Sequence, residues 1–349
     1  MIAALSLALL AGAPPAIAQG GCVDREEIMV KAKQATLPRG RWLPEIHARL
    51  LELIDRHGAK AKAFDPCRRP LAVFDWDNTV IAGDIGDQAF NTAAERAFFK
   101  PDPEILEPLP EDLAGAMKQA WKKDATEAAG ELRYLYHRAY AALCADKGNA
   151  VCYPWIARAF HGHSARELER FAAEVIEREL AREIASEEVR GDGDPIQVSR
   201  GVRVRPEMRD LLKTLVESGF DVFIVTASPE WLIQTFALEV QLPRENVLGI
   251  RTVADRDGRL TPKIAPPVTY REGKVAAIRT RIAPGGRRPV LAAGDAETDW
   301  EMLDEASHLA VLIDRAGEGL RAHARARGWA VQPVFESVGQ RAPTPTIRR

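Results

Sequence analysis

The sequence has nearly equal numbers of acidic and basic residues, few cysteines, and no long hydrophobic segment after its N-terminal region. Its 349 residues include 48 Lys and Arg against 50 Asp and Glu, giving a net charge of −2 with both signs interspersed. No basic stripe is available for a phosphate backbone, so we do not expect a nucleic-acid partner. The 46% of hydrophobic and 28% of charged residues exclude disordered, collagen-like and coiled-coil chains. The length allows one large or two modest globular domains.

The first 18 residues have the pattern of a secretory signal. An apolar run over residues 2–12 precedes a proline pair and a small-residue triplet at 16–18. The run is shorter than the roughly 20 residues of a transmembrane helix, and no later segment supplies one, so we expect no stable membrane span. We therefore predict a signal peptide over residues 1–18 and a periplasmic or secreted protein. The first charged residue is Asp24, so the usual basic start is missing, and an apolar anchor or a buried strand is the alternative.

The four cysteines are even in number, which fits an exported protein. None forms a Cys-x-x-Cys pair or has a histidine at zinc-finger spacing, so we do not expect a zinc site. The segment between Cys144 and Cys152 contains Gly and Asn and suits a tight loop, which predicts a disulfide between these two. Cys22 and Cys67 would then tie an N-terminal arm to the main domain. Four buried free thiols in a reducing compartment are the alternative.

Short apolar segments predict the strands of a parallel sheet. They occupy residues 71–74, 222–225, 247–250, 289–293 and 308–313. Helical segments of about 10 to 12 residues separate the later strands. This alternation predicts an α/β fold with a Rossmann-like, doubly wound parallel sheet, in which the chemistry lies at the carboxyl ends of the strands.

A long insertion separates the first predicted strand from the second. More than 100 residues there show no strand pattern, and Ser164 with Glu167 forms a capping box before a long amphipathic helix. We therefore predict an all-helical cap. The predicted organisation is a signal peptide (1–18), an N-terminal helical arm (19–70), a core (71–84 and 201–335), a helical cap (85–200) and a disordered tail (336–349).

Acidic residues follow two of the predicted strands directly. Asp75 and Asp77 come after the first strand, with Thr79 two positions later, and Asp295 and Asp299 come after the fourth. A hydroxyl at the end of the second strand and a lysine near a helix start complete the set: Thr226 and Lys274. Because the carboxyl ends of parallel strands meet at one edge, we expect these side chains to share a crevice. Helix caps and turn acids explain any one of them, but not the ordered set.

These residues give the chain its resemblance to the haloacid dehalogenase superfamily, over almost all of its length after the leader. The four family motifs are matched in order by Asp75-x-Asp77-x-Thr79, by Thr226, by Lys274, and by Asp295 with Asp299. An insertion between the first two motifs is typical of the branch, subfamily IB, that contains phosphoserine phosphatases and periplasmic phosphorylcholine phosphatases. Residues 151–155, Val-Cys-Tyr-Pro-Trp, resemble the cap of the phosphorylcholine phosphatases. Ala296 and Thr298 replace the Gly and Asn of the phosphoserine phosphatase fourth motif, so the contacts there differ.

The resemblance implies a phosphomonoester hydrolase that works through an aspartyl-phosphate intermediate. Asp75 is implied as the nucleophile, and Asp77 as the acid that protonates the leaving alkoxide and then deprotonates water. Mg²⁺ is implied as the cofactor, bound by Asp75, the backbone carbonyl of Asp77 and Asp295, with Asp299 orienting its waters. The implied ligands of the phosphoryl oxygens are Thr79, Thr226 and Lys274.

The resemblance also suggests how the substrate is recognised. Asp84 lies nine positions after Asp75, where phosphoserine phosphatase has an acid that meets the amino group of its substrate. Trp76, Tyr153 and Trp155 offer aromatic faces to a quaternary ammonium. A solvated loop acid and ordinary packing aromatics are the alternatives. The expected substrate is a small cationic phosphomonoester, with phosphorylcholine favoured.

Other functions share parts of this pattern. A phosphoserine phosphatase-like enzyme or a broad-specificity acid phosphatase would carry the same motifs. An inactive, phospholigand-binding pseudo-phosphatase should lack a nucleophile, an acid or a metal ligand, yet Asp75, Asp77 and Asp295 are all present. Dehalogenation would leave Asp77 without a proton to deliver. We infer no obligate protein partner.

Overall fold

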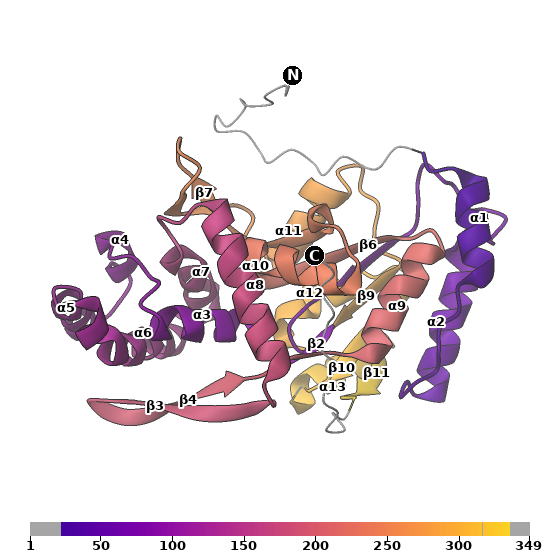
Figure 1. Ribbon diagram of the computed structural model, residues 1–349. Coiled ribbons are helices and arrows are strands. Elements are labelled where there is room, and N and C mark those ends of the chain that lie inside the picture. The colour runs from indigo at the N-terminus through magenta and orange to yellow at the C-terminus, as the bar shows by residue number, and fades with distance from the viewer. Residues whose placement is uncertain (1–21, 316, 336–349) are drawn as a thin grey trace, which may run out of the picture.

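The computed structural model describes residues 22–315 and 317–335, so the predicted signal peptide (1–18) and tail (336–349) lie outside the described residues. A seven-stranded sheet lies at the centre of this part of the chain, in the order β11-β10-β9-β1-β6-β7-β8 (Figure 1). Neighbouring strands are parallel except for β7 and β8. The strands are β1 (Leu71–Phe74), β6 (Asp221–Pro229), β7 (Val247–Ala254), β8 (Leu260–Ala265), β9 (Leu291–Gly294), β10 (Leu309–Asp314) and β11 (Ala330–Pro333).

Helices cover both faces of the sheet. Phe74 and Ile224 pack into a cluster on one face, whereas Val73 and Val225 pack into a second cluster on the other. Strand β1 is therefore buried on both sides, which explains why its four residues are all apolar. The helices of the first face are α2 (Pro44–His57), α9 (Pro206–Glu217) and α10 (Glu230–Phe236). Those of the second face are α11 (Glu272–Ala277), α12 (Trp300–Asp304) and α13 (Glu318–Arg327).

The predicted α/β fold with a doubly wound sheet is confirmed. The five predicted strands correspond to β1, β6, β7, β9 and β10, with ends that differ by a few residues. The sequence prediction missed β8 and β11, which form the two edges of the sheet. Each contains a proline, Pro262 or Pro333, which is tolerated at an edge but weakens the strand pattern.

The insertion leaves and re-enters the core through two short paired strands, β2 (Ile81–Ala82) and β5 (Arg203–Val204). Between them lie helices on the side of the molecule away from α1 (Arg25–Gln34) and α2 (Figure 1). These helices are α3 (Ile85–Glu95), α4 (Pro103–Leu106), α5 (Glu111–Ala120), α6 (Ala125–Lys147), α7 (Asn149–Ala159) and α8 (Ala165–Ala181).

The prediction that the insertion is all-helical is wrong, because β3 (Ala185–Gly191) and β4 (Gly193–Arg200) form an antiparallel hairpin. Only Val189 and Val198 are buried in it, so polar side chains obscure the alternation that would reveal a strand. Gly191 and Gly193 flank the turn, and a Cβ atom at either would collide with Tyr134 of α6. The Gly-Asp-Gly segment of residues 191–193 is therefore the turn of the hairpin.

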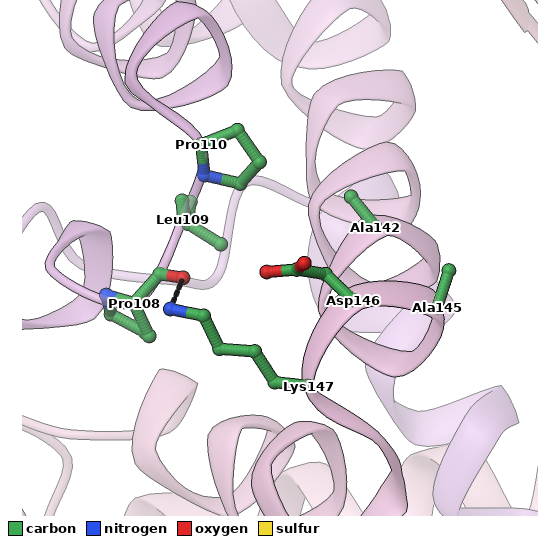
Figure 2. Close-up of a pocket in the computed structure, with 7 residues that line it drawn as sticks. All are labelled: Pro108, Leu109, Pro110, Ala142, Ala145, Asp146 and Lys147. Atoms are coloured by element: carbon green, nitrogen blue, oxygen red, sulfur yellow. Dashed lines mark hydrogen bonds between the residues drawn. The ribbon is translucent and has the colours of Figure 1, made fainter.

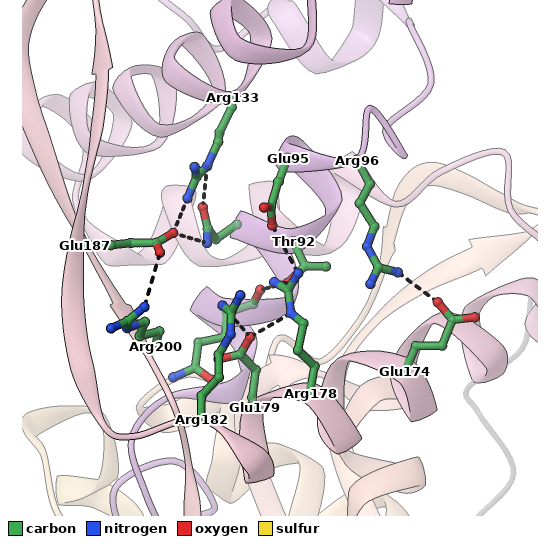
Figure 3. Close-up of polar contacts among 12 residues, drawn as sticks. Thr92, Glu95, Arg96, Arg133, Glu174, Arg178, Glu179, Arg182, Glu187 and Arg200 are labelled. Carbon is green, nitrogen blue, oxygen red and sulfur yellow. Dashed lines mark hydrogen bonds and ion pairs between the residues drawn. The ribbon is translucent and has the colours of Figure 1, made fainter. Parts of the chain in front are cut away.

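A polar network fixes α8 against α3 and against the return to the core (Figure 3). The buried Glu179 accepts hydrogen bonds from the backbone N–H of Gly201 at 2.8 Å and from Arg178 Nε at 3.0 Å. Arg178 also donates to Thr92 Oγ1 at 2.5 Å and pairs with Glu95 at 3.1 Å. The network thereby positions α3, whose first turn lies at the candidate site. Arg133 of α6 pairs with Glu187 and so attaches the hairpin, whereas the pair of Arg200 with Glu187 joins its two strands.

Both predicted disulfides are present. Cys22 and Cys67, with Cα atoms 4.0 Å apart, join the N-terminal arm to the segment before β1. Cys144 and Cys152, with Cα atoms 5.1 Å apart, join the end of α6 to the start of α7. In the part of the chain that the structure describes, no helix combines the length and the apolar character that a membrane crossing requires.

Candidate active site

Polar residues lie at the carboxyl ends of four neighbouring strands of the sheet. Asp75 follows β1, Asp295 follows β9, Arg315 follows β10, and Thr226 lies in the last part of β6. Together with side chains from the insertion, these residues line a cavity of about 190 Å³. The carboxyl edge of the sheet, where the sequence predicts the chemistry, is therefore hollowed and polar.

Lys274 is completely buried beneath this cavity. Its Nζ lies 2.6 Å from Asp75 Oδ1 and 2.6 Å from Asp299 Oδ1. Burial alone would lower the pKa of Lys274, but the carboxylates of Asp299 and Asp75 outweigh burial and raise it. Lys274 is therefore an ammonium ion that bridges two buried acids.

Asp75 and Asp295 face each other across a hydroxyl group. Thr79 Oγ1 lies 3.3 Å from Asp75 Oδ2 and 3.0 Å from Asp295 Oδ1, and Arg315 donates to Asp295 Oδ2 at 2.9 Å. Burial and the charge of Asp299 raise the pKa of Asp75 well above its usual range, against the effect of Lys274. The same two causes raise the pKa of Asp295 to about 6. The site thus concentrates more negative charge than its own cations neutralise.

Asp299 supports the loop that follows β9. Its Oδ2 accepts hydrogen bonds from the backbone N–H groups of Asp295 at 3.0 Å and Ala296 at 3.2 Å, while Oδ1 faces Lys274. A Cβ atom at Gly294 would lie 2.6 Å from the Asp299 side chain, so glycine permits this close approach. Both oxygens of Asp299 therefore already have protein partners.

The carboxylate of Asp77 is fixed by two donors. Its Oδ1 accepts from the backbone N–H of Ile85 at 2.8 Å, and its Oδ2 accepts from Ser228 Oγ at 2.6 Å. Burial, and then the charge of Asp84, raise the pKa of Asp77 well above its usual range. Asp77 is consequently an oriented carboxyl group that favours its protonated form more than an ordinary aspartate does.

Two acids from the start of α3 lie in the wall of the cavity. Asp84 is the N-cap of α3, and its Oδ1 accepts from the backbone N–H of Asp87 at 2.9 Å. The carboxylate of Asp87 has no hydrogen-bond or ion-pair partner among the described residues. Burial, and then the charge of Asp84, raise the pKa of Asp87 well above its usual range. Asp87 is thus the acid whose charge the described structure leaves uncompensated.

Two tyrosines from the insertion complete the wall. Tyr140 of α6 and Tyr153 of α7 line the same cavity as the two acids. Burial, and then the charges of nearby acids, raise the pKa values of both phenols, which are therefore neutral at physiological pH. The Tyr153 ring packs edge-on against Tyr270 with centroids 5.7 Å apart. The wall therefore combines negative charge with aromatic faces.

A family model matches this arrangement in sequence. The model of the haloacid dehalogenase-like hydrolases covers residues 72–304, which include the whole insertion and the ends of β1, β6 and β9. The chain belongs to the haloacid dehalogenase-like hydrolase family.

This hydrolase is similar to a named phosphatase and to two proteins of unknown function. A phosphorylcholine phosphatase of Pseudomonas aeruginosa is 28% identical over an alignment of 264 residues that covers 66% of this chain and 70% of that protein. A conserved, functionally unknown protein of Anaerococcus prevotii has a similar structure, with a TM-score of 0.74, 26% identity and coverage of 84% of this chain and 93% of its own. A Bordetella pertussis protein of unknown function has a TM-score of 0.53 and 19% identity, over 76% of this chain and 98% of its own.

The structure brings together most of the residues singled out from the sequence of this hydrolase. Those within the cluster or the cavity wall are Asp75, Asp77, Thr79, Asp84, Tyr153, Thr226, Lys274, Asp295 and Asp299. Trp155 lies elsewhere: it is 1% exposed and donates its indole N–H to the carbonyl of Ile105 at 2.8 Å. Trp76 is likewise buried, against Phe236.

Four residues of the site were missed from the sequence: Arg315, Ser228, Asp87 and Tyr140. Ser228 follows Thr226 by two positions, and this second hydroxyl at a strand end was an available signal. Asp87 lies one helical turn after Asp84, so an acid pair at i, i+3 was a second signal. Tyr140 had none, because only the packing of α6 against α7 brings it to the cavity.

The residues present fit a hard divalent cation. One carboxylate oxygen from each of Asp75, Asp295 and Asp299 lies within 4.8 Å of the other two, and all three residues are buried. Mg²⁺ prefers oxygen donors, and the raised pKa values of Asp75 and Asp295 indicate repulsion that a cation would relieve. Because Asp75 and Asp295 line the cavity and Asp299 does not, Asp75 and Asp295 are the more accessible ligands.

Proposed function

We propose that this hydrolase cleaves small phosphomonoesters through an aspartyl-phosphate, requires Mg²⁺, and prefers substrates with a cationic alcohol. The observation that carries the proposal is the arrangement around one cavity. Asp75 lies at its base beside Lys274, Asp77 is oriented next to it, and Asp87 lies unpaired in the wall. A phosphoryl group at the base would leave its alcohol facing the wall.

Asp75 and Asp77 divide the chemistry between them. A carboxylate oxygen of Asp75 forms a bond to phosphorus as the bond to the alcohol oxygen breaks, and Asp77 donates its proton to that oxygen. Asp77 then takes a proton from water, whose oxygen bonds to phosphorus as the Asp75–phosphorus bond breaks and releases inorganic phosphate. The raised pKa of Asp77 suits the first step, and its contacts with Ser228 and Ile85 keep it oriented.

The remaining polar residues position the reacting groups. Lys274 and Thr226 are the proposed ligands of the phosphoryl oxygens, and Thr79 spaces Asp75 from Asp295. Asp75, Asp295 and the backbone carbonyl of Asp77 are the proposed Mg²⁺ ligands, with Asp299 as their support. When bound, Mg²⁺ supplies positive charge that offsets the repulsion between an anionic nucleophile and an anionic phosphate.

The proposed preference for a cationic alcohol rests on the cavity wall. An ammonium group there would meet the unpaired carboxylate of Asp87, with Asp84, Tyr140 and Tyr153 in the same lining. The phosphorylcholine phosphatase relative supports phosphorylcholine as the substrate. Phosphoserine also carries an ammonium group, so a phosphoserine phosphatase-like activity is the second candidate. The two disulfides support a periplasmic or secreted location.

A phosphate-release panel tests this proposal. With Mg²⁺ present, we expect release from phosphorylcholine, phosphoethanolamine and phosphoserine to be faster than from glycerol phosphate, which has a neutral alcohol of similar size. Excess EDTA should stop release from all four, and added Mg²⁺ should restore it. A protein that binds these esters but releases no phosphate would instead be the inactive phospholigand-binding alternative.

Asp87→Asn tests the origin of the preference. We expect the ratio of kcat/KM for phosphorylcholine to kcat/KM for glycerol phosphate to fall by about tenfold to a hundredfold, because the substrate loses a desolvated partner charge. Asp84→Asn is the matched comparison: asparagine is an equally good N-cap, so the helix start is retained, and a smaller fall is expected. An unchanged ratio in Asp87→Asn would contradict the assignment of Asp87.

A further inference from the structure

The disulfide between Cys144 and Cys152 lies next to both tyrosines of the cavity wall. Tyr140 precedes Cys144 by four residues, so the two lie on the same side of α6 one turn apart. Tyr153 directly follows Cys152 at the start of α7. No described residue hydrogen-bonds either phenol oxygen. The two rings pack against Phe90 and Tyr270, but no hydrogen bond fixes their phenol ends, so the spacing between the rings follows from how the ends of α6 and α7 are held together.

The start of α7 has little support from its own backbone. Gly148, its N-cap, provides no side-chain acceptor for the first N–H groups. Pro154 lies inside the helix and has no N–H, so the hydrogen bond that residue 154 would donate to the carbonyl of Ala150 is absent. Tyr153 is thus carried by a weakened segment of helix. The covalent link at Cys152 supplies the restraint that capping and backbone hydrogen bonds do not.

The end of α6, by contrast, is anchored. Figure 2 shows this end beside the segment of Pro108, Leu109 and Pro110, where Lys147 Nζ donates to the carbonyl of Pro108 at 2.8 Å. Leu143, one turn earlier in α6, is buried in the main hydrophobic cluster. The disulfide therefore ties a weak segment to a fixed one.

We propose that the Cys144–Cys152 disulfide positions Tyr153 relative to Tyr140 and thereby sets the affinity of the enzyme for cationic substrates. The inference rests on the proposed function and deepens it. The disulfide does not touch the reacting atoms, so its loss changes binding of the cationic alcohol and not the phosphoryl chemistry. The other disulfide, Cys22–Cys67, joins segments that contribute no residue to the cavity.

The test compares two double variants, C144S/C152S and C22S/C67S, with the wild-type protein. In C144S/C152S we expect KM for phosphorylcholine to rise about tenfold, while kcat for phosphorylcholine and KM for glycerol phosphate stay within about twofold of wild type. C22S/C67S should retain the wild-type ratio of the two KM values. Choline binding, measured by calorimetry, should weaken by the same factor in C144S/C152S alone, which tests the proposal without turnover.

Two further measurements test the proposal if C144S/C152S folds poorly. Dithiothreitol added to C22S/C67S reduces only the Cys144–Cys152 bond, and the same rise in KM should follow and reverse on reoxidation. Pro154→Ala in the C144S/C152S background restores a backbone donor to α7 and should recover part of the affinity. Equal effects on both substrates, an equal shift in C22S/C67S, or unchanged choline binding would overturn the proposal. Absence of phosphate release from every ester by wild type would overturn the proposed function instead.

Discussion

Replacing Asp75 with asparagine is expected to abolish phosphate release. Asparagine has nearly the same shape but no anionic oxygen to attack phosphorus, so we expect kcat to fall by roughly 10⁴-fold or more. The fold should persist, because Lys274 retains Asp299 as a partner at 2.6 Å and the surrounding strands are unchanged. Phosphate release from phosphorylcholine with Mg²⁺, together with circular dichroism of the variant, measures both effects.

The matched control for Asp75→Asn is Asp221→Asn. Asp221 also belongs to a central strand and also pairs with a cation, Arg287 at 2.9 Å, but it lies at the opposite end of β6 from the cavity. Its loss should leave kcat within about twofold of wild type, because Asp221 contributes nothing to the cavity or to the reacting groups. A second measurement uses wild-type enzyme quenched with acid during turnover. Peptide analysis should then find phosphate attached to the peptide that contains Asp75. Undiminished turnover by Asp75→Asn would refute the aspartyl-phosphate route.

The central fold could be predicted from the sequence because its signals are local. A strand buried on both faces must be apolar throughout, so Leu71 to Phe74 stand out, and so do the neighbouring strands. The hairpin β3–β4 lacks such a signal because it buries only Val189 and Val198. The same holds for the proline-containing edge strands. The strands that were not predicted are those that face solvent or pair with a single neighbouring strand.

The site divides in the same way. Asp75, Thr226 and Asp295 are predictable because parallel topology brings strand ends to one edge, whatever the rest of the chain does. The wall is different, because it depends on how the insertion packs. Tyr153 and Trp155 illustrate this: two residues apart on α7, they point about 200° apart, so only one can face the cavity. The sequence of residues 151–155 does not show which side of the helix faces the cavity. Tertiary packing decides that Tyr153, and not Trp155, lies there.

Lys274→Met is expected to destabilise the protein and to impair catalysis. Lys274 is fully buried between Asp75 and Asp299, and methionine leaves both carboxylates without their shared cation. Removing one partner from a buried ion pair costs about 3 to 5 kcal/mol of unfolding free energy. Urea unfolding in EDTA, which removes any contribution from bound metal, measures this loss. Because Lys274 is also a proposed phosphoryl ligand, kcat should fall by roughly 10²- to 10³-fold.

Combining Lys274→Met with Asp299→Asn separates these two roles. The introduced amide can still accept from the backbone N–H groups of residues 295 and 296, but it no longer carries a charge that needs a cation. We therefore expect the double variant to be more stable than the sum of the single losses predicts, by about 1 to 3 kcal/mol. Its kcat should nevertheless remain as low as that of Lys274→Met, because neutralising Asp299 restores the balance of buried charge and not the ammonium beside the phosphoryl group. Purely additive stabilities would contradict the bridging role of Lys274, whereas recovered turnover would remove it from the proposed chemistry.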